Sequence, residues 1–481
     1  MAAHLFSRRT IWVHRQIVLT DTATIRITQA NSSLSLKGQV SGTGYLVKDG
    51  AGQLNFTYVG TNGFAGVIVK KGTIAQGAWN STFGKLGSPM LLAGGEVHQI
   101  DVNSTSTVPD FNYQVTVAAG TTNKILGSSR GKINGSISGA GNLTIQTRYV
   151  RCDVGASFKN FEGTLTALGD GGNFRLMTSA ADMSKARLVV GAGTTVSFMT
   201  SGGGSDASAT LKIGTLQGTA TDGVLGGSQS SYQAGFLNED SKFSGLLKGQ
   251  RFTKVGTGKL TLLTAGHTSP ITVSGGMLVA QNATSTAFTS AAVTVGNGGT
   301  LAGTALLQNV TVQKGGTILG GMGTTGTGVL RLSGNLVMSE GASMRCLLGN
   351  STGNAQLNVK GKITHNADTL VIVVPAGRKL NVGDEIQVFT AGFSSASGEV
   401  IVRSECEDCS YEFDSSQLNS EGKVTVMSTV SGIQTLQGTD TKVDVYSLDG
   451  QLLRSKMSQR EALEGLPAGV YVLGNGRKVK K

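Results

Sequence analysis

Short strand patterns separated by glycine recur along most of this chain, and they restrict its fold more than any other feature. The segment VTVGNGGTL at residues 293–301 reappears as VTVQKGGTI at residues 310–318. Apolar and polar residues alternate in both copies, which is the period of a β-strand with one apolar face. One such unit cannot bury that face alone, whereas stacked units bury a continuous core. The pattern therefore predicts a β-solenoid.

A longer repeat supports the same interpretation. VKDGAGQLNF at residues 47–56 recurs as TKVGTGKLTL at residues 253–262, and looser copies occupy residues 36–48 and 133–146. Strand patterns continue from about Ile25 to Val374 without a proline-rich linker, which argues against a row of separate β-sandwiches. We therefore predict an all-β chain with a right-handed parallel β-helix over residues 18–400.

Glycine supplies 71 of the 481 residues and proline only 5. That glycine content is about twice the average, but it has no Gly-X-Y period, so the chain is not collagen-like. The 39% of hydrophobic residues exceeds what a disordered chain contains. Glycine-rich turns between strands of β-branched residues account for this composition.

The longer copies resemble autotransporter-associated β-strand repeats. The shared pattern is S-G-x-G-x-L-x-K-x-G-x-G-x-L-x-L, followed by a loop and a Gly-Gly-x-Leu strand, and it covers roughly residues 18 to 400. Its positions include Lys, Gly, Gly and Leu in each of two copies: Lys48, Gly50, Gly52, Leu54 and Lys254, Gly256, Gly258, Leu260. The resemblance implies an exported β-helix displayed at a cell surface.

From about Ser431 the chain has fewer glycines and more charges. Strand patterns separated by Asp-Gly, Leu-Pro-Ala-Gly and Gly-Asn-Gly turns predict a small antiparallel β-sandwich over residues 431–481. Residues 401–430 are interpreted as a β-hairpin cap or linker.

This last segment resembles the C-terminal sorting domain of type IX secretion. The resemblance implies recognition by the secretion machinery through a sorting motif, which comprises Val443, Val445, Tyr446, Gly450, Leu466, Pro467, Gly469, Val470, Tyr471, Asn475, Gly476, Lys478, Val479 and Lys481.

The charge balance bears on the partner. The chain has 41 Lys and Arg against 29 Asp and Glu, a net charge of +12, which suits acidic glycans or an acidic host or matrix surface. The bases are scattered and no recognition fold accompanies them, so nucleic acid is not an expected partner.

No apolar stretch is long enough to span a membrane. Residues 1–17 have no clear signal peptide, so either export follows an unusual route or the true start lies upstream.

Catalytic motifs are not evident, and we predict no catalytic residue, cofactor or metal site. Acidic residues are sparse, and the five histidines are dispersed. The C-x-x-C pair Cys406 and Cys409 lies among acidic residues, which disfavour an activated thiolate. We therefore interpret the pair as part of a turn, and the sequence leaves open whether the two cysteines form a local disulfide. Trp79 lies in a Gly/Ser-rich stretch and is a candidate glycan contact.

These observations favour a secreted or cell-surface β-helix protein of a Gram-negative bacterium, acting as a non-catalytic adhesin or surface scaffold. One alternative is a polysaccharide lyase or glycoside hydrolase built on the β-helix. Another is the non-catalytic C-terminal part of a larger secreted carbohydrate-active enzyme.

Overall fold

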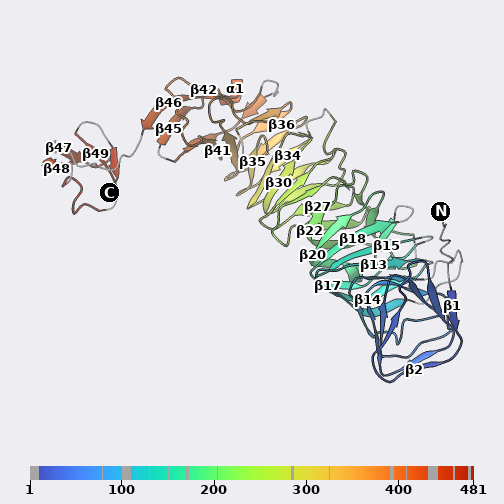
Figure 1. Ribbon diagram of the computed structural model, residues 1–481. Helices are drawn as coiled ribbons and strands as arrows, with labels where there is room; N and C mark the ends of the chain where they lie inside the picture. The colour runs from blue at the N-terminus through green and yellow to red at the C-terminus, as the bar shows by residue number, and fades with distance from the viewer. Residues whose placement is uncertain are drawn as a thin grey trace, which may run out of the picture.

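The structure is a computed structural model, and it is almost entirely β (Figure 1). It describes residues 10–78, 80–99, 110–128, 130–148, 151–169, 173–202, 204–282, 286–323, 326–390, 395–407, 409–431, 442–458, 461–467, 469–474 and 478–480. Two parts are considered in turn, a parallel β-solenoid and a small antiparallel sheet. Both were predicted from the sequence, and both are confirmed.

One 18-stranded parallel sheet accompanies the solenoid from its first described turn to its last. Each strand pairs with the equivalent strand of the next turn, for example Leu54 with Ile74 and Val293 with Val310. In pairing order the strands are β1 (Thr10–Val13), β4 (Ser33–Leu36), β7 (Gln53–Phe56), β9 (Gly72–Gln76), β11 (Gly95–His98), β13 (Thr122–Gly127), β15 (Asn142–Thr147), β18 (Thr164–Gly169), β20 (Asp182–Val190), β22 (Ala209–Gln217), β24 (Ser230–Ala234), β27 (Arg251–Lys254), β29 (Ile271–Val273), β31 (Val293–Val295), β34 (Val310–Val312), β37 (Leu336–Met338), β40 (Lys362–Thr364) and β43 (Ser395–Ser397).

Two further parallel sheets, of 12 and 8 strands, form a second side of the solenoid in its N-terminal and C-terminal halves. The first comprises β3 (Ala23–Arg26), β6 (Tyr45–Asp49), β8 (Gly66–Val69), β10 (Pro89–Leu92), β12 (Phe111–Val117), β14 (Lys132–Gly139), β16 (Asp153–Val154), β17 (Ser157–Phe161), β19 (Asn173–Leu176), β21 (Thr195–Phe198), β23 (Val224–Leu225) and β26 (Leu246–Leu247). The second comprises β25 (Ser241–Phe243), β28 (Lys259–Leu262), β30 (Gly276–Ala280), β32 (Gly299–Gly303), β35 (Thr317–Leu319), β38 (Ser343–Leu347), β41 (Asp368–Val373) and β44 (Val400–Glu405).

Shorter pieces complete the turns. They are the pair β2 (Ile17–Leu19) and β5 (Val40–Gly42), the three strands β33 (Leu306–Leu307), β36 (Val329–Leu332) and β39 (Gln356–Val359), and the 3₁₀ turn η1 (Thr178–Ala180).

The core of the solenoid consists of inward-facing columns, in which one apolar side chain per turn stacks on the next. Leu54, Ile74, Val97 and Ile125 occupy one such column in successive turns, and each is 0% exposed. Because strand side chains alternate between faces, one register keeps every second residue of each strand inside. The leucine of the repeated motif is therefore a core position.

The lysine of the repeated motif is buried as well. The Lys48 ammonium donates hydrogen bonds to the carbonyls of Asp49, Gly50 and Lys71, at 3.0, 2.6 and 2.9 Å. The equivalent Lys254 donates to Val255, Gly256 and Gly275, at 2.7, 3.1 and 3.2 Å. Each ammonium thus satisfies carbonyls of its own corner and of the following turn, which buried backbone groups require.

The glycine two residues after each lysine is required by the backbone. Gly50 and Gly256 have φ values of +78° and +69°, a region that residues with a Cβ rarely adopt. A Cβ at Gly256 would also lie 2.0 Å from the carbonyl oxygen of Gly235 in the preceding turn. The spaced Lys-x-Gly motif therefore encodes a tight corner that a buried ammonium holds together.

An antiparallel hairpin closes the C-terminal end of the solenoid. β45 (Cys409–Asp414) and β46 (Lys423–Ser431) pair with each other, and β42 (Glu385–Gln387) pairs with β46. The short helix α1 (Leu418–Glu421) lies between the two long strands, and Tyr411, Val424 and Val426 join the solenoid core. The parallel solenoid extends from Thr10 to Glu405 in the described residues, slightly beyond the predicted 18–400.

The small C-terminal sheet has its own core. Its four antiparallel strands are ordered β48 (Leu452–Ser458), β47 (Lys442–Tyr446), β49 (Val470–Leu473) and β50 (Lys478–Lys480). Val445, Tyr471 and Val479 pack with Ala462 and Leu463 of the connecting turns. The predicted small antiparallel unit at the C-terminal end is thus present as an antiparallel sheet on which these turns pack.

Candidate functional site

A row of threonines follows the outer face of the 18-stranded sheet. Thr253, Thr272, Thr294 and Thr311 lie on β27, β29, β31 and β34, each in register with the next. All four are half-exposed. Their inward neighbours, such as Val293 and Val295 on either side of Thr294, are buried in the core. Successive hydroxyls are therefore spaced by about one strand separation, roughly 4.8 Å.

Basic side chains flank this row. Arg251 is exposed on the same face of β27 as Thr253, because the two are two positions apart in the strand. In the other direction the column continues through Val337 to Thr364, and the exposed Lys362 shares the face of Thr364. Lys212 and Gln233 precede Thr253 in the same column. We call this set the threonine face: Lys212, Gln233, Arg251, Thr253, Thr272, Thr294, Thr311, Lys362 and Thr364.

A second hydroxyl column lies on the 8-stranded sheet. Thr300, Thr317, Ser343 and Thr369 are in register in successive turns and are half-exposed. The residues on either side of them in this column are apolar, Met277 and Ile401. This column offers the same hydroxyl spacing as the threonine face with a different flanking chemistry.

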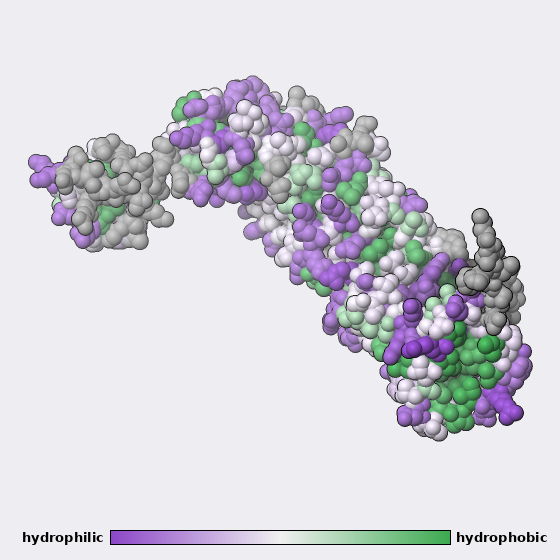
Figure 2. All heavy atoms as spheres, viewed as in Figure 1, coloured by the Kyte–Doolittle hydropathy of each residue, from purple (hydrophilic) through white to green (hydrophobic). Residues whose placement is uncertain are grey.

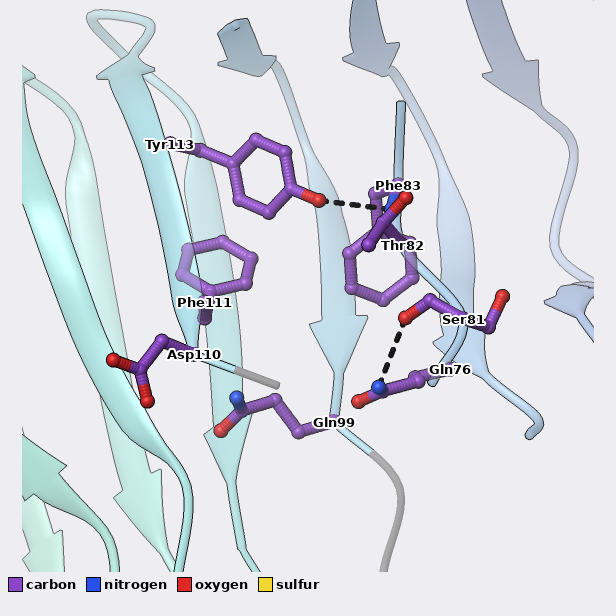
Figure 3. A pocket seen from close by; sticks show the side chains of 8 residues that line it. All are labelled: Gln76, Ser81, Thr82, Phe83, Gln99, Asp110, Phe111 and Tyr113. Carbon is purple, nitrogen blue, oxygen red and sulfur yellow. Dashed lines mark hydrogen bonds between the residues drawn. The ribbon is translucent and has the colours of Figure 1, made fainter. Parts of the chain in front are cut away.

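A small hollow near the N-terminal end is lined by residues from two successive turns, those that begin with β9 and β11 (Figure 3). The Gln76 amide donates to the Ser81 carbonyl at 2.9 Å, and the Tyr113 hydroxyl accepts from the Phe83 N–H at 2.9 Å. Gln99 is buried beside them, with its amide nitrogen lacking a hydrogen-bond partner in the described residues. The cavity of about 10 Å³ matches the space that one water molecule needs, so it is too small for a sugar.

Three acidic residues of the solenoid that could serve in catalysis, Asp153, Glu239 and Asp240, are paired with bases. Asp153 is buried and accepts from the Arg175 Nε at 2.7 Å and from the Gly202 N–H at 3.1 Å. Arg187 binds Glu239 through two nitrogens, and this pairing holds the pKa of Glu239 below its usual value. The neighbouring Asp240 binds Lys259 instead. Glu239 and Asp240 therefore lie in separate ion pairs and do not form a dyad with each other.

The cysteines are unsuited to nucleophilic chemistry. Cys152 and Cys346 are free thiols buried in the core, and burial raises the pKa of Cys346 to about 12. Burial also raises the pKa of Cys152. Cys406, which follows β44, and Cys409, the first residue of β45, form a disulfide. These thiols therefore remain protonated or oxidised near neutral pH.

Two histidines are buried in the solenoid, far apart in sequence. The His365 Nδ1 lies 3.0 Å from both carboxylate oxygens of Asp368. The His267 Nδ1 accepts from the Leu247 N–H at 3.0 Å, and its ring lies 4.7 Å from that of Phe288. Burial lowers the pKa of His267 to about 4. His267 is therefore a neutral core residue at pH 7.

This lowered pKa predicts an acid sensitivity. The folded state keeps His267 neutral down to about pH 4, whereas the unfolded state takes up a proton near pH 6.5. The stabilisation is complete above pH 6.5 and is lost as the pH falls to 4, by about 3 kcal/mol in total. The variant His267→Asn, which keeps an acceptor for Leu247, should lack this component. Urea unfolding of both proteins from pH 7.5 to 4 measures the difference, and parallel pH profiles would contradict the prediction.

The sequence-predicted sorting motif maps mainly onto the small sheet. Val443, Val445, Tyr471 and Val479 are core residues, and the Tyr471 hydroxyl donates to the Pro467 carbonyl at 2.6 Å. Gly450 has a φ of +85° in the turn between β47 and β48. Tyr446, Val470 and Lys478 lie half-buried on β47, β49 and β50, and Leu466 and Gly469 lie on the connection. Asn475, Gly476 and Lys481 lie outside the described residues.

Trp79, the predicted glycan contact, also lies outside the described residues. Sequence reasoning did not find the threonine face, although its signal was present in the repeated VTV and ITV strands.

Among the described residues no group of three or more His, Cys, Asp or Glu side chains is placed to hold a metal ion. In the same part of the chain, no helix has the length and apolar character needed to cross a membrane.

No protein-family profile matches this chain, and no curated protein matches it. The class that the structure defines is therefore a parallel β-solenoid with a small antiparallel C-terminal sheet.

Proposed function

We propose that this protein is an exported, surface-displayed rod that binds extended acidic glycans without chemical turnover, as an adhesin or surface scaffold. The observation that carries the proposal is the threonine face. Four hydroxyls repeat at the strand spacing, and exposed bases lie at both ends of the column. An extended polysaccharide also presents hydroxyl and acidic groups at regular intervals along its length.

Binding on such a surface is additive along the rod. Each hydroxyl supplies a weak hydrogen bond exposed to water, but several contacts made by one chain combine as linked binding events. Lys212, Arg251 and Lys362 add a longer-range attraction for uronate or sulfate groups, and salt screens this attraction. We therefore expect affinity to increase with glycan length and to decrease with ionic strength.

Export and display are proposed on two resemblances. The solenoid repeats resemble those of autotransporter passengers, and the small sheet carries most of a type IX sorting pattern, with Val445, Tyr471 and Val479 in its core. In this proposal the small sheet is the element that the secretion machinery recognises. Protease accessibility of the full chain on intact cells tests the location.

Removing hydroxyls from the threonine face should reduce glycan binding selectively. The double variant Thr272→Val/Thr294→Val keeps side-chain shape and is expected to weaken binding to immobilised heparin or polygalacturonate by about tenfold, because two central hydrogen bonds are lost. The free energy of unfolding should change by less than about 0.5 kcal/mol, since both side chains face outward. Binding is measured on a glycan array and by interferometry.

The matched control is Thr300→Val/Thr317→Val, which removes two hydroxyls from the second column and should leave binding within about twofold. Equal losses in both double variants would contradict a specific threonine face. Turnover assays on the same polysaccharides run in parallel, and release of new reducing ends or unsaturated products would contradict the non-catalytic proposal.

A further inference from the structure

The first described turn of the solenoid exposes inward-facing apolar side chains. Ile11 on β1 pairs in register with Leu34, and Leu34 with Leu54, so Ile11 belongs to an inward column. Later members of that column, such as Leu54 and Ile74, are 0% exposed, whereas Ile11 is 62% exposed. Among the described residues, Ile11 is therefore a core-column residue with a neighbouring strand on one side only.

The other inward positions of the first turn follow the same trend. Ile17 and Ala23 are half-buried, whereas their partners in the second turn, Val40 and Leu46, are 1% exposed. Figure 2 shows apolar surface gathered at this end of the rod, where β1 and β2 lie. Capping repeats of solenoids normally present a polar outer side. The first described turn instead presents apolar side chains.

Strand edges add to the apolar surface. Among the described residues β1, β2 and β3 each pair on one side only, with β4, β5 and β6. The opposite end differs, because the β45–β46 hairpin covers it. We call the three free edges, with the inward side chains of Ile11, Val13, Ile17 and Ile25, the N-terminal end face.

We propose that the N-terminal end face is a homodimer interface, in which two copies of this chain stack head to head about a two-fold axis. Such an axis runs the strands of one copy antiparallel to those of the other, so all three edges gain partners at once. Stacking stops at two copies, because the hairpin closes the other end of each solenoid. The interface is therefore isologous and closed.

Strand lengths and charges select one orientation. With the axis through β2, the three-residue β2 lies against its own copy, and the four-residue β1 lies against the partner copy's β3. The corner between β1 and β2 then faces the corner between β2 and β3. The exposed Arg15 occupies the first corner and the exposed Asp21 the second, so two pairs of opposite charge meet across the interface.

The size of the face sets the expected affinity. Thr10 and Ser33 are partners one turn apart, so the first turn contains 23 residues. A triangular turn of that length, at about 3.3 Å per residue, encloses on the order of 300 Å² per copy, well below the roughly 1,200 Å² total of a standard stable interface. Eleven strand residues per copy add main-chain hydrogen bonds. We expect dissociation constants of roughly 1–100 µM.

Sedimentation equilibrium of the full chain between about 1 and 200 µM tests the proposal. The wild-type chain should show a monomer–dimer equilibrium. Arg15→Glu places like charges together at both corners and should raise the dissociation constant by about tenfold or more, and Asp21→Arg should do the same. The double variant Arg15→Glu/Asp21→Arg restores opposite charges and should return the constant to within about threefold. Both positions are exposed, so all variants should fold.

A cysteine placed on the axis tests the orientation. Val18 is the central residue of β2 and is 60% exposed, so Val18→Cys should lie opposite its own copy and form an intermolecular disulfide. Thr294→Cys, on the threonine face, is the matched control and should not cross-link. A chain that stays monomeric at 200 µM overturns the proposal, as does a dimer that ignores the charge variants. If deleting residues 2–9 turns such a monomer into a dimer, the chain's own N-terminal residues occupy the face instead.

Discussion

Replacing Lys254 by methionine is expected to lower the free energy of unfolding by about 3 kcal/mol or more. Methionine keeps most of the volume but leaves the carbonyls of Val255, Gly256 and Gly275 without their donor. A buried acceptor without a partner costs about 1–3 kcal/mol. Burial lowers the pKa of Lys254 to about 8, so at pH 7 the side chain still donates as an ammonium. Urea unfolding at pH 7, followed by circular dichroism, measures the change.

The control for this variant is Lys248→Met. Lys248 lies six residues before Lys254, between β26 and β27, but its side chain is exposed. Its replacement should therefore change the free energy of unfolding by less than about 0.5 kcal/mol. Lys48→Met should behave like Lys254→Met, because the ammonium of Lys48 has the same three-carbonyl environment. Similar small effects for the buried and the exposed lysine would show that the ammonium is not what holds the corner.

Replacing Arg175 by methionine is expected to lower the free energy of unfolding by about 3–5 kcal/mol, because it leaves the charge of Asp153 buried without its cation. The Arg175 Nε lies 2.7 Å from Asp153, and both side chains are less than a tenth exposed. The double variant Asp153→Leu/Arg175→Met removes both charges and should recover a large part of this loss. Guanidinium unfolding of the single and double variants measures both values.

An exposed pair supplies the comparison. Arg345 binds Glu405 through two hydrogen bonds of 2.8 and 2.6 Å, but both side chains are much more exposed. Arg345→Met should cost at most about 1 kcal/mol, because solvent and salt screen the pair. If the two single variants cost the same, burial is not what makes the Asp153–Arg175 pair important.

Much of the fold could be read from strand period and turn chemistry. Alternation in segments such as VTVGNGGTL requires strands with one buried face, and glycine pairs require tight corners, so repeated copies stack in parallel. The Asp-Gly and Leu-Pro-Ala-Gly turns likewise indicated an antiparallel unit at the C-terminal end. The two family resemblances and the functional role stay predictions, because neither strand order nor core packing depends on them.

The register between turns was not readable from the sequence. Val310 is 17 residues after its partner Val293, yet Leu336 is 26 residues after Val310, because loops of different length are accommodated outside the core. Without the register, the threonines of β27, β29, β31 and β34 are isolated residues. With it, they form one continuous row.

The repeated strand pattern, which continues without a linker over most of the chain, was thus enough to predict a stacked β-solenoid, because stacking buries the apolar face that one unit cannot bury alone. The three-dimensional packing then settled which residues share an environment. It buried Lys48 and Lys254 in rings of carbonyls, joined Asp153 to Arg175 across a turn, and left Ile11 exposed at the end of an otherwise dry column. These outcomes depend on neighbours from other turns, and such neighbours are fixed only when the chain is wound.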